Sequence, residues 1–218
     1  MTDRATTTPD PCATSGDFHD LMAKIRTCKE KPPSPCQELT SRRYYFEPNP
    51  STAQEWRAEG FYLSGIDPRV VFVCESPGKF GAEDKDQTEP SRCFAKANTS
   101  WDRRFRDTLK KHGYGNCYMT NTVKCGVRKG NRHTELELSA CSCFLVRELD
   151  LLEPLVAVGV GENAHRTLRQ DVLPRLRCPP VCFQITHFYA RRDVDARWER
   201  EFAELKRLLA RLKPRSDW

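Results

Sequence analysis

Three polar side chains stand directly after short apolar runs, at places where they could do chemistry. Glu75 follows the run Arg69–Cys74, and its carboxylate could accept a proton from water or offset a cationic centre. Asn121 ends a second run, and its amide offers both a donor and an acceptor to the edge of a base. His187 follows the run Val181–Thr186 and could donate a proton or stabilise negative charge. Alone, the turn at Glu75 is equally well explained as a strand-to-loop connection with an exposed side chain.

The elements that must position these residues alternate along the chain. Apolar runs rich in β-branched residues predict strands at Arg69–Cys74, Asn116–Asn121 and Leu155–Gly159, with a weaker fourth at Val181–Thr186. Helical patterns occupy residues 18–27, 101–112, 135–152, 162–168 and 194–212. The alternation predicts an α/β fold of three layers, α/β/α, around a four-stranded parallel sheet. Ligands bind beyond the carboxyl ends of such strands, so the residues that follow each strand are expected to meet there.

Length and composition predict one domain. The chain has 218 residues, a formal net charge of +6 and 30% charged residues, which suits a polyanionic partner without proving one. We expect a disordered tail over residues 1–17 and a single domain over residues 18–218. No apolar stretch resembles a signal sequence or a membrane span of about 18 residues. We therefore expect an intracellular, cytoplasmic monomer with no membrane partner.

Eleven cysteines are too many for an ordinary reduced protein of this size, and an odd number does not suit a simple disulfide framework. A metal or iron–sulfur site explains them better, and it could also pin the long irregular stretch Cys28–Gly65. Cys74 and Cys117 lie in predicted strands and are expected in the core. Cys178 and Cys182 flank a Pro-Pro turn, where a second metal pair is the less favoured interpretation.

Several segments, in this order, resemble the uracil-DNA glycosylase superfamily, and in particular its family 4, the iron–sulfur enzymes. They are Cys74-Glu75-Ser76-Pro77-Gly78, Cys93-Phe94-Ala95-Lys96, Thr120–Cys125, Pro154–Gly159 and the histidine segment His187-Phe188-Tyr189-Ala190. The resemblance covers roughly residues 28–209. It implies a monofunctional DNA glycosylase of base excision repair, which hydrolyses the N-glycosidic bond of uracil or a related deaminated base in DNA and leaves an abasic site.

The resemblance also implies roles for individual residues. Glu75 would orient a water molecule, and His187 would stabilise the departing base. Asn121 would read the edge of an extruded base, on which Phe94 would stack, while backbone amides near Ser76 and Gly78 add contacts. The predicted contacts to the DNA backbone are basic residues on the same edge of the sheet: Lys124, Arg128, Arg191 and Arg192.

The family's cluster ligands correspond here to Cys28, Cys36, Cys125 and Cys141, which would hold a [4Fe-4S] cluster. Zinc remains an alternative, and Cys143 could replace Cys141. Three other functions stay open. One is a glycosylase for hypoxanthine or xanthine, another is an inactive nucleic-acid-binding module with the same fold, and the third is a zinc-stabilised interaction domain without a pocket.

Overall fold

The computed structural model describes most of the α/β core of the chain. The residues described are 20–21, 24–25, 46–47, 67–75, 91–92, 100–115, 117–124, 135–190 and 193–212. The strands of the main sheet are β2 (Asp67–Cys74), β4 (Cys117–Asn121), β5 (Val156–Val160) and β6 (Val181–Ile185). The main helices are α4 (Ser100–Lys111), α5 (Glu135–Leu152), α6 (Glu162–Thr167) and α7 (Val194–Arg211). Two short strands, β1 (Phe46–Glu47) and β3 (Ser91–Arg92), form a separate parallel pair.

The four main strands form one parallel sheet in the order β4-β2-β5-β6. Cys74 at the end of β2 pairs with Asn121 at the end of β4, and Gly159 of β5 pairs with Val73 on one side and Gln184 on the other. The carboxyl ends of β2 and β4 are therefore level, about 4.8 Å apart as neighbouring strands are. This edge brings together the segments that follow all four strands.

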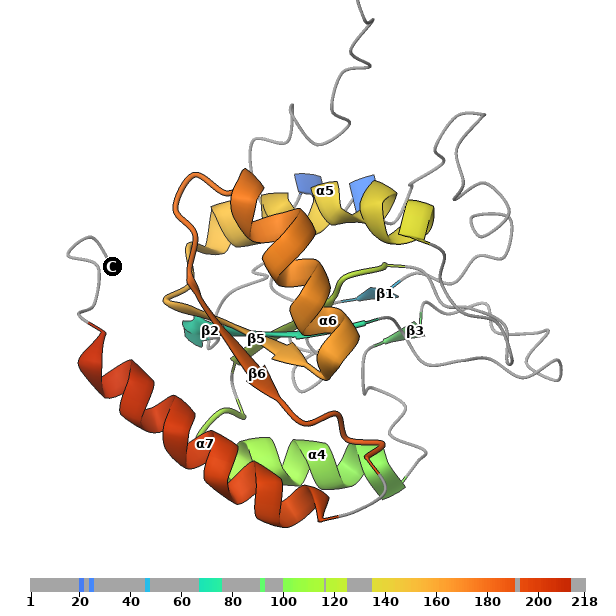
Figure 1. Cartoon of the computed structure of the whole chain (residues 1–218). Coiled ribbons are helices and arrows are strands. Elements are labelled where there is room, and N and C mark those ends of the chain that lie inside the picture. Colours follow the sequence, from blue (N-terminus) through green and yellow to red (C-terminus); the bar gives the residue numbers. More distant parts are fainter. Residues whose placement is uncertain are drawn as a thin grey trace, which may run out of the picture.

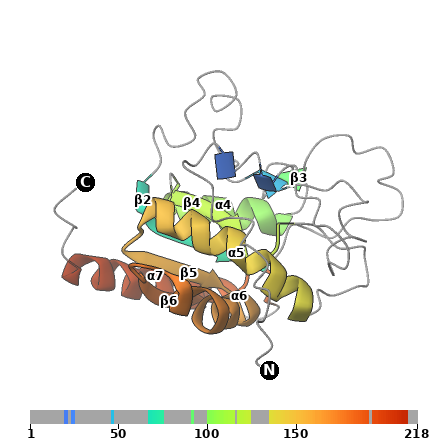
Figure 2. The ribbon, with the colours of Figure 1, turned by 90° about the horizontal axis from the view of Figure 1, so that it is seen from above.

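Helices cover both faces of the sheet (Figures 1 and 2). The side chains of β2 alternate between the two faces: Val71 and Val73 pack in the cluster formed with α5 and Leu168, whereas Val70 and Phe72 pack in the cluster formed with α4 and α7. This period of two is what a strand buried on both faces requires. The predicted three-layer α/β/α fold with a four-stranded parallel sheet is confirmed.

The predicted elements match closely, with one extension. The helix predicted at residues 162–168 continues beyond α6 through a π-helical turn, Leu168–Val172, and a 3₁₀ turn, Leu173–Arg175. Leu168 and Val172 are both buried and keep this segment against the sheet. Residues 1–17 lie outside the described residues, so the division into tail and domain stays a prediction. No helix in the part of the chain that is described is long and apolar enough to cross a membrane.

Candidate active site

Glu75 is held at the end of β2 by backbone contacts from the next strand. Its carbonyl accepts hydrogen bonds from the Val123 N–H at 3.0 Å and from the Thr122 hydroxyl at 2.6 Å. The Thr122 N–H also donates to the Cys74 carbonyl at 2.8 Å. These bonds extend the β2–β4 ladder past the last paired residues, so the backbone that carries the carboxylate is fixed. Thr122 has this positioning role in addition to its place in the Thr120–Cys125 segment.

The turn between β5 and α6 depends on two glycines. A Cβ on Gly159 would lie 2.5 Å from the Cα of His165, so only glycine lets α6 pack this closely against β5. Gly161 has φ +89°, and a Cβ there would come within 3.0 Å of the His187 side chain. The Gly161 N–H donates to the Ile185 carbonyl at 2.8 Å. This turn therefore places the start of α6 between Glu75 and His187.

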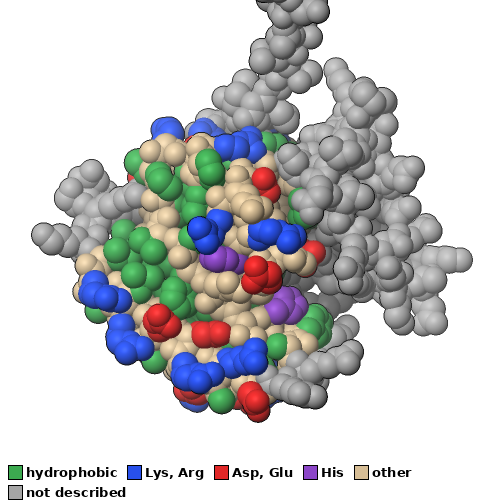
Figure 3. Space-filling view, in the orientation of Figure 1, with side chains coloured by type: hydrophobic (Ala, Val, Ile, Leu, Met, Phe, Trp, Pro, Cys, Tyr) green, Lys and Arg blue, Asp and Glu red, His purple; other side chains and the backbone are tan. Residues whose placement is uncertain are grey.

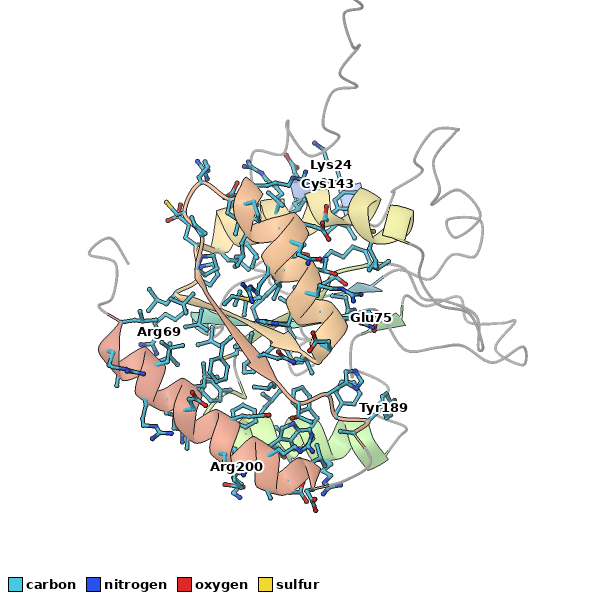
Figure 4. All side chains as sticks on the ribbon, viewed as in Figure 1. Lys24, Arg69, Glu75, Cys143, Tyr189 and Arg200 are labelled. Atoms are coloured by element: carbon cyan, nitrogen blue, oxygen red, sulfur yellow. The ribbon has the colours of Figure 1, made fainter. Side chains whose placement is uncertain are left out.

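The carboxylate of Glu75 is in contact with that turn. The Asn163 side-chain amide donates from Nδ2 to Oε2 of Glu75 at 3.1 Å. Asn163 donates to Glu75, and a Cβ on Gly161 would approach His187, so the Glu75 carboxylate and the His187 imidazole both lie close to one short turn. Figure 4 shows Glu75 and Tyr189, the second residue after His187, on the same side of the molecule, with Arg69 near the opposite end of β2. The structure therefore brings the β2, β5 and β6 strand ends into one site.

Helix α7 fixes the end of β6, the strand that precedes His187. Glu201 accepts hydrogen bonds from the Thr186 N–H at 2.8 Å and from its hydroxyl at 2.6 Å. The Trp198 indole N–H donates to the Thr186 carbonyl at 2.8 Å. Trp198 is buried, as is Phe202 one turn later. Thr186, the residue before His187, thus forms hydrogen bonds to α7 through both its backbone and its side chain. These bonds fix the position of the backbone that carries the imidazole.

The imidazole of His187 has a defined orientation. The backbone N–H of Tyr189 donates to Nδ1 at 3.1 Å, so Nδ1 presents a lone pair and the neutral ring carries its proton on Nε2. The ring stacks on Phe188 with centroids 4.3 Å apart, and Phe188 stacks in turn on Phe105 of α4. In this tautomer, Nε2–H is the donor that the ring would offer to a ligand that collects negative charge.

Asn121 lies beside Cys74 in the sheet and is completely buried. Its backbone carbonyl accepts a hydrogen bond from the Lys124 ammonium at 2.7 Å, which closes the turn after β4. The structure thus places Asn121 next to Cys74 and Glu75 along the strand ends.

The structure corrects the role given to Lys124. Its side chain is 3% exposed, and the ammonium pairs with the Glu148 carboxylate of α5 at 2.6 Å and with the Thr120 hydroxyl at 2.7 Å. Thr120 also donates to Glu148 at 2.8 Å, and the Tyr118 hydroxyl lies at 3.4 Å. Burial and the neighbouring Glu148 raise the pKa of Tyr118 well above its usual range, so the phenol stays protonated. Lys124 is a buried structural cation here, and a DNA phosphate cannot reach it.

A signal for this pair exists in the sequence of α5. Glu148 stands between Leu145 and Leu152, at the spacing that puts all three on one helix face, and Leu145 and Leu152 are buried. A carboxylate on an apolar face is expected to have a buried cation as its partner. Only the tertiary structure identifies that cation as Lys124.

Of the four proposed cluster ligands, the structure describes Cys141, which is buried in α5. Cys141 precedes Glu148 by seven residues, nearly two helical turns, so both stand on one face of α5. Lys124, the residue before Cys125 in the chain, is held against Glu148 on that same face. The thiol of Cys141 is a donor that a cluster could use, whereas Cys143, two residues further along α5, faces another direction. Within the described ranges, no group of three or more metal-binding side chains is assembled.

Other site residues predicted from sequence lie outside the described residues and stay predictions: Ser76, Gly78, Phe94, Arg128, Arg191, Arg192, Cys28, Cys36 and Cys125. Cys74 and Cys117 are buried in the core, as expected. Cys178 is exposed, and burial raises the pKa of the Cys182 thiol to about 11. The face drawn in Figure 3 carries mixed basic and acidic side chains around two histidines.

Comparison with known proteins agrees with this geometry. The Type-4 uracil-DNA glycosylase of Thermotoga maritima is 31% identical over 100 residues, which cover 45% of this chain and 48% of that protein. The chain thus aligns with about half the length of this relative. The family model described as the Uracil DNA glycosylase superfamily matches residues 61–214, the region that holds β2 through α7 and every described site residue. The chain belongs to the uracil-DNA glycosylase superfamily.

Proposed function

We propose that the chain is a DNA glycosylase that hydrolyses the bond between a deaminated base, with uracil as the first candidate, and its deoxyribose. The observation that supports this proposal is that Glu75, Asn121 and His187 all lie at the carboxyl ends of strands in one parallel sheet. Cys74, the residue before Glu75, pairs with Asn121, Asn163 donates to Glu75, and a Cβ on Gly161 would lie 3.0 Å from the His187 side chain. A base-binding module without turnover would not need a carboxylate at a surface that approaches phosphates.

The proposed reaction assigns one task to each group. Water attacks C1′ of the sugar, its proton passes to the Glu75 carboxylate, and the C1′–N bond breaks with its electron pair leaving on the base. The carboxylate also offsets the positive charge that develops on the sugar. The Nε2–H of His187 donates to the departing base anion, and the fixed tautomer keeps this donor ready. Asn121 reads the base edge once the nucleotide has been extruded from the duplex.

The experiment uses DNA duplexes that each contain one uracil, hypoxanthine or xanthine, with alkali cleavage to reveal abasic sites. Glu75→Gln and Asn121→Ala should each abolish base release, whereas Glu162→Gln should not. Glu162 is the matched control because it is an exposed carboxylate on α6 that accepts a hydrogen bond from Gln184. Full activity of the folded Glu75→Gln variant would refute the proposed site. Release of hypoxanthine or xanthine without uracil would keep the site and change the substrate.

The cofactor proposed for this fold is a [4Fe-4S] cluster held by Cys28, Cys36, Cys125 and Cys141. Bound there, it would cross-link the segment before β2 to α5 through four thiolates. Protein purified without oxygen should contain four irons and four sulfides per chain. Cys141→Ser should lower that content, and Cys143→Ser should leave it unchanged because this residue lies on another face of α5. Stoichiometric zinc without iron would contradict the cluster.

A further inference from the structure

Asn163 is an exposed residue of α6 for which the sequence analysis proposed no individual role. It lies in the first turn of α6, shortly after β5, and its Nδ2 donates to Oε2 of the Glu75 carboxylate at 3.1 Å. The bond joins two elements that are 88 residues apart in the chain, so it exists only because the sheet places β5 beside β2.

The orientation of the Asn163 amide is fixed by its second neighbour. Arg166, one turn further along α6, lies with Nη2 at 3.4 Å from Oδ1 of Asn163. A flipped amide would turn its oxygen toward the Glu75 carboxylate and its NH₂ toward the guanidinium, and both contacts would be repulsive. The carboxylate and the guanidinium thus select one orientation, with the donor facing Glu75.

The backbone that carries Asn163 is also restrained. The next residue, Ala164, is buried, and the close approach of His165 to Gly159 leaves no room for α6 to shift toward β5. The His165 N–H donates to the Gly161 carbonyl at 3.2 Å, which closes the first helical turn. An amide on this backbone reaches Glu75 without a rearrangement of the fold.

The geometry points to Asn163 as a positioning residue that holds the Glu75 carboxylate in the orientation needed to direct water, with Arg166 setting the amide. This inference rests on the proposed function of Glu75. The amide engages Oε2, and Oε1 is the oxygen assigned to the water. Asn163 acts through Glu75 and touches neither the base nor the sugar, so its loss should affect the chemical step and leave DNA binding intact.

The test measures single-turnover base release and DNA affinity for Asn163→Ala and Asn163→Asp. The rate should fall roughly tenfold or more in Asn163→Ala, because displacement of a reacting group by about 1 Å can cost a hundredfold. Asn163→Asp should lose more, since it keeps the shape and replaces the donor with a second carboxylate. The affinity of Asn163→Ala for the substrate duplex should equal that of the parent, whereas Asn163→Asp adds a negative charge and should bind somewhat more weakly.

Two comparisons separate positioning from a general effect on the surface. Gln184→Ala is the matched control, because Gln184 donates an exposed amide hydrogen bond to Glu162 of the same helix at 3.2 Å. It should leave the rate unchanged. Long incubations at high enzyme concentration measure whatever slow release survives in Glu75→Gln, and adding Asn163→Ala to that variant should cause no further loss, because residues that act through one group are not additive.

The outcomes distinguish the two proposals. An active parent whose rate is unchanged by Asn163→Ala, or a Glu75→Gln background in which Asn163→Ala still costs tenfold, overturns the positioning role and leaves the glycosylase proposal standing. A parent that releases none of the deaminated bases overturns the glycosylase proposal, and the positioning role with it. Asn163 is exposed, so failure to fold is not expected to obscure either result.

Discussion

The buried ion pair between Lys124 and Glu148 makes a strong prediction about stability. Both side chains are almost inaccessible to water, and Lys124 replaces its lost hydration with Glu148, Thr120 and the Asn121 carbonyl. Lys124→Met leaves the Glu148 carboxylate buried without its cation, which should lower the free energy of unfolding by about 3–5 kcal/mol. That is a large part of the roughly 5–15 kcal/mol that a domain has in total.

Replacing both members should cost much less than replacing one. In Lys124→Met with Glu148→Leu no charge remains buried, and apolar replacements of buried pairs are often neutral or stabilising. The remaining cost is the loss of hydrogen bonds by the Thr120 and Tyr118 hydroxyls and the Asn121 carbonyl, about 0.5–1.5 kcal/mol each. The double variant should therefore be more stable than either single variant.

Urea unfolding followed by tryptophan fluorescence measures these differences, with buried Trp198 as a reporter. Lys111→Met is the matched control, because Lys111 forms an exposed ion pair with Glu199 and such pairs contribute little. A loss below about 1 kcal/mol in Lys124→Met would mean that this pair behaves like a surface pair. A double variant less stable than both single variants would also refute the reasoning. If Lys124→Met does not fold, the double variant still decides the question.

Two further predictions concern a glycine of the site and a pair of cysteines outside it. Gly161→Ala should destabilise the protein by at least about 1 kcal/mol and slow base release, because it combines a positive φ with a Cβ 3.0 Å from His187. Gly113→Ala has a similar φ of +85° and open space around the Cβ, so it should be destabilising without slowing the reaction. Alkylation of thiols near neutral pH should modify exposed Cys178 well before Cys182, whose thiolate forms only as the pH approaches its raised pKa of about 11. Equal labelling of the two at neutral pH would contradict the burial of Cys182.

The strands and helices could be predicted because each has a strong local pattern. The run Val70–Cys74 is apolar throughout and can only be a strand buried on both faces, since its neighbours in the sequence are turn residues. The order β4-β2-β5-β6 could not be derived in the same way, because local patterns carry no information on which strand lies beside which. The meeting of Glu75 with Asn163 follows from that order.

Lys124 shows why charge and position along the chain are insufficient to assign a DNA contact. It follows a strand on the expected ligand edge, as a phosphate-binding residue would, and the sequence favoured that role. The free energy of burying its ammonium depends on Glu148, which is 24 residues away and on another layer. A carboxylate on the apolar face of α5 was visible in the sequence, but its partner was not.

The described site is organised by contacts that do not involve a ligand. The Glu75 backbone is fixed by Thr122, the Thr186 backbone by α7, and the His187 ring by Phe188 and the Tyr189 N–H. These contacts form when the chain folds, so Glu75 and His187 are already ordered before any DNA binds. Binding would then carry no further entropic cost for ordering these two side chains. In the proposed reaction, the energy of DNA binding would then be used to extrude a nucleotide. It follows that a base already unpaired or mismatched should be released faster than the same base in a matched duplex, and equal rates on the two would show that extrusion does not limit the reaction.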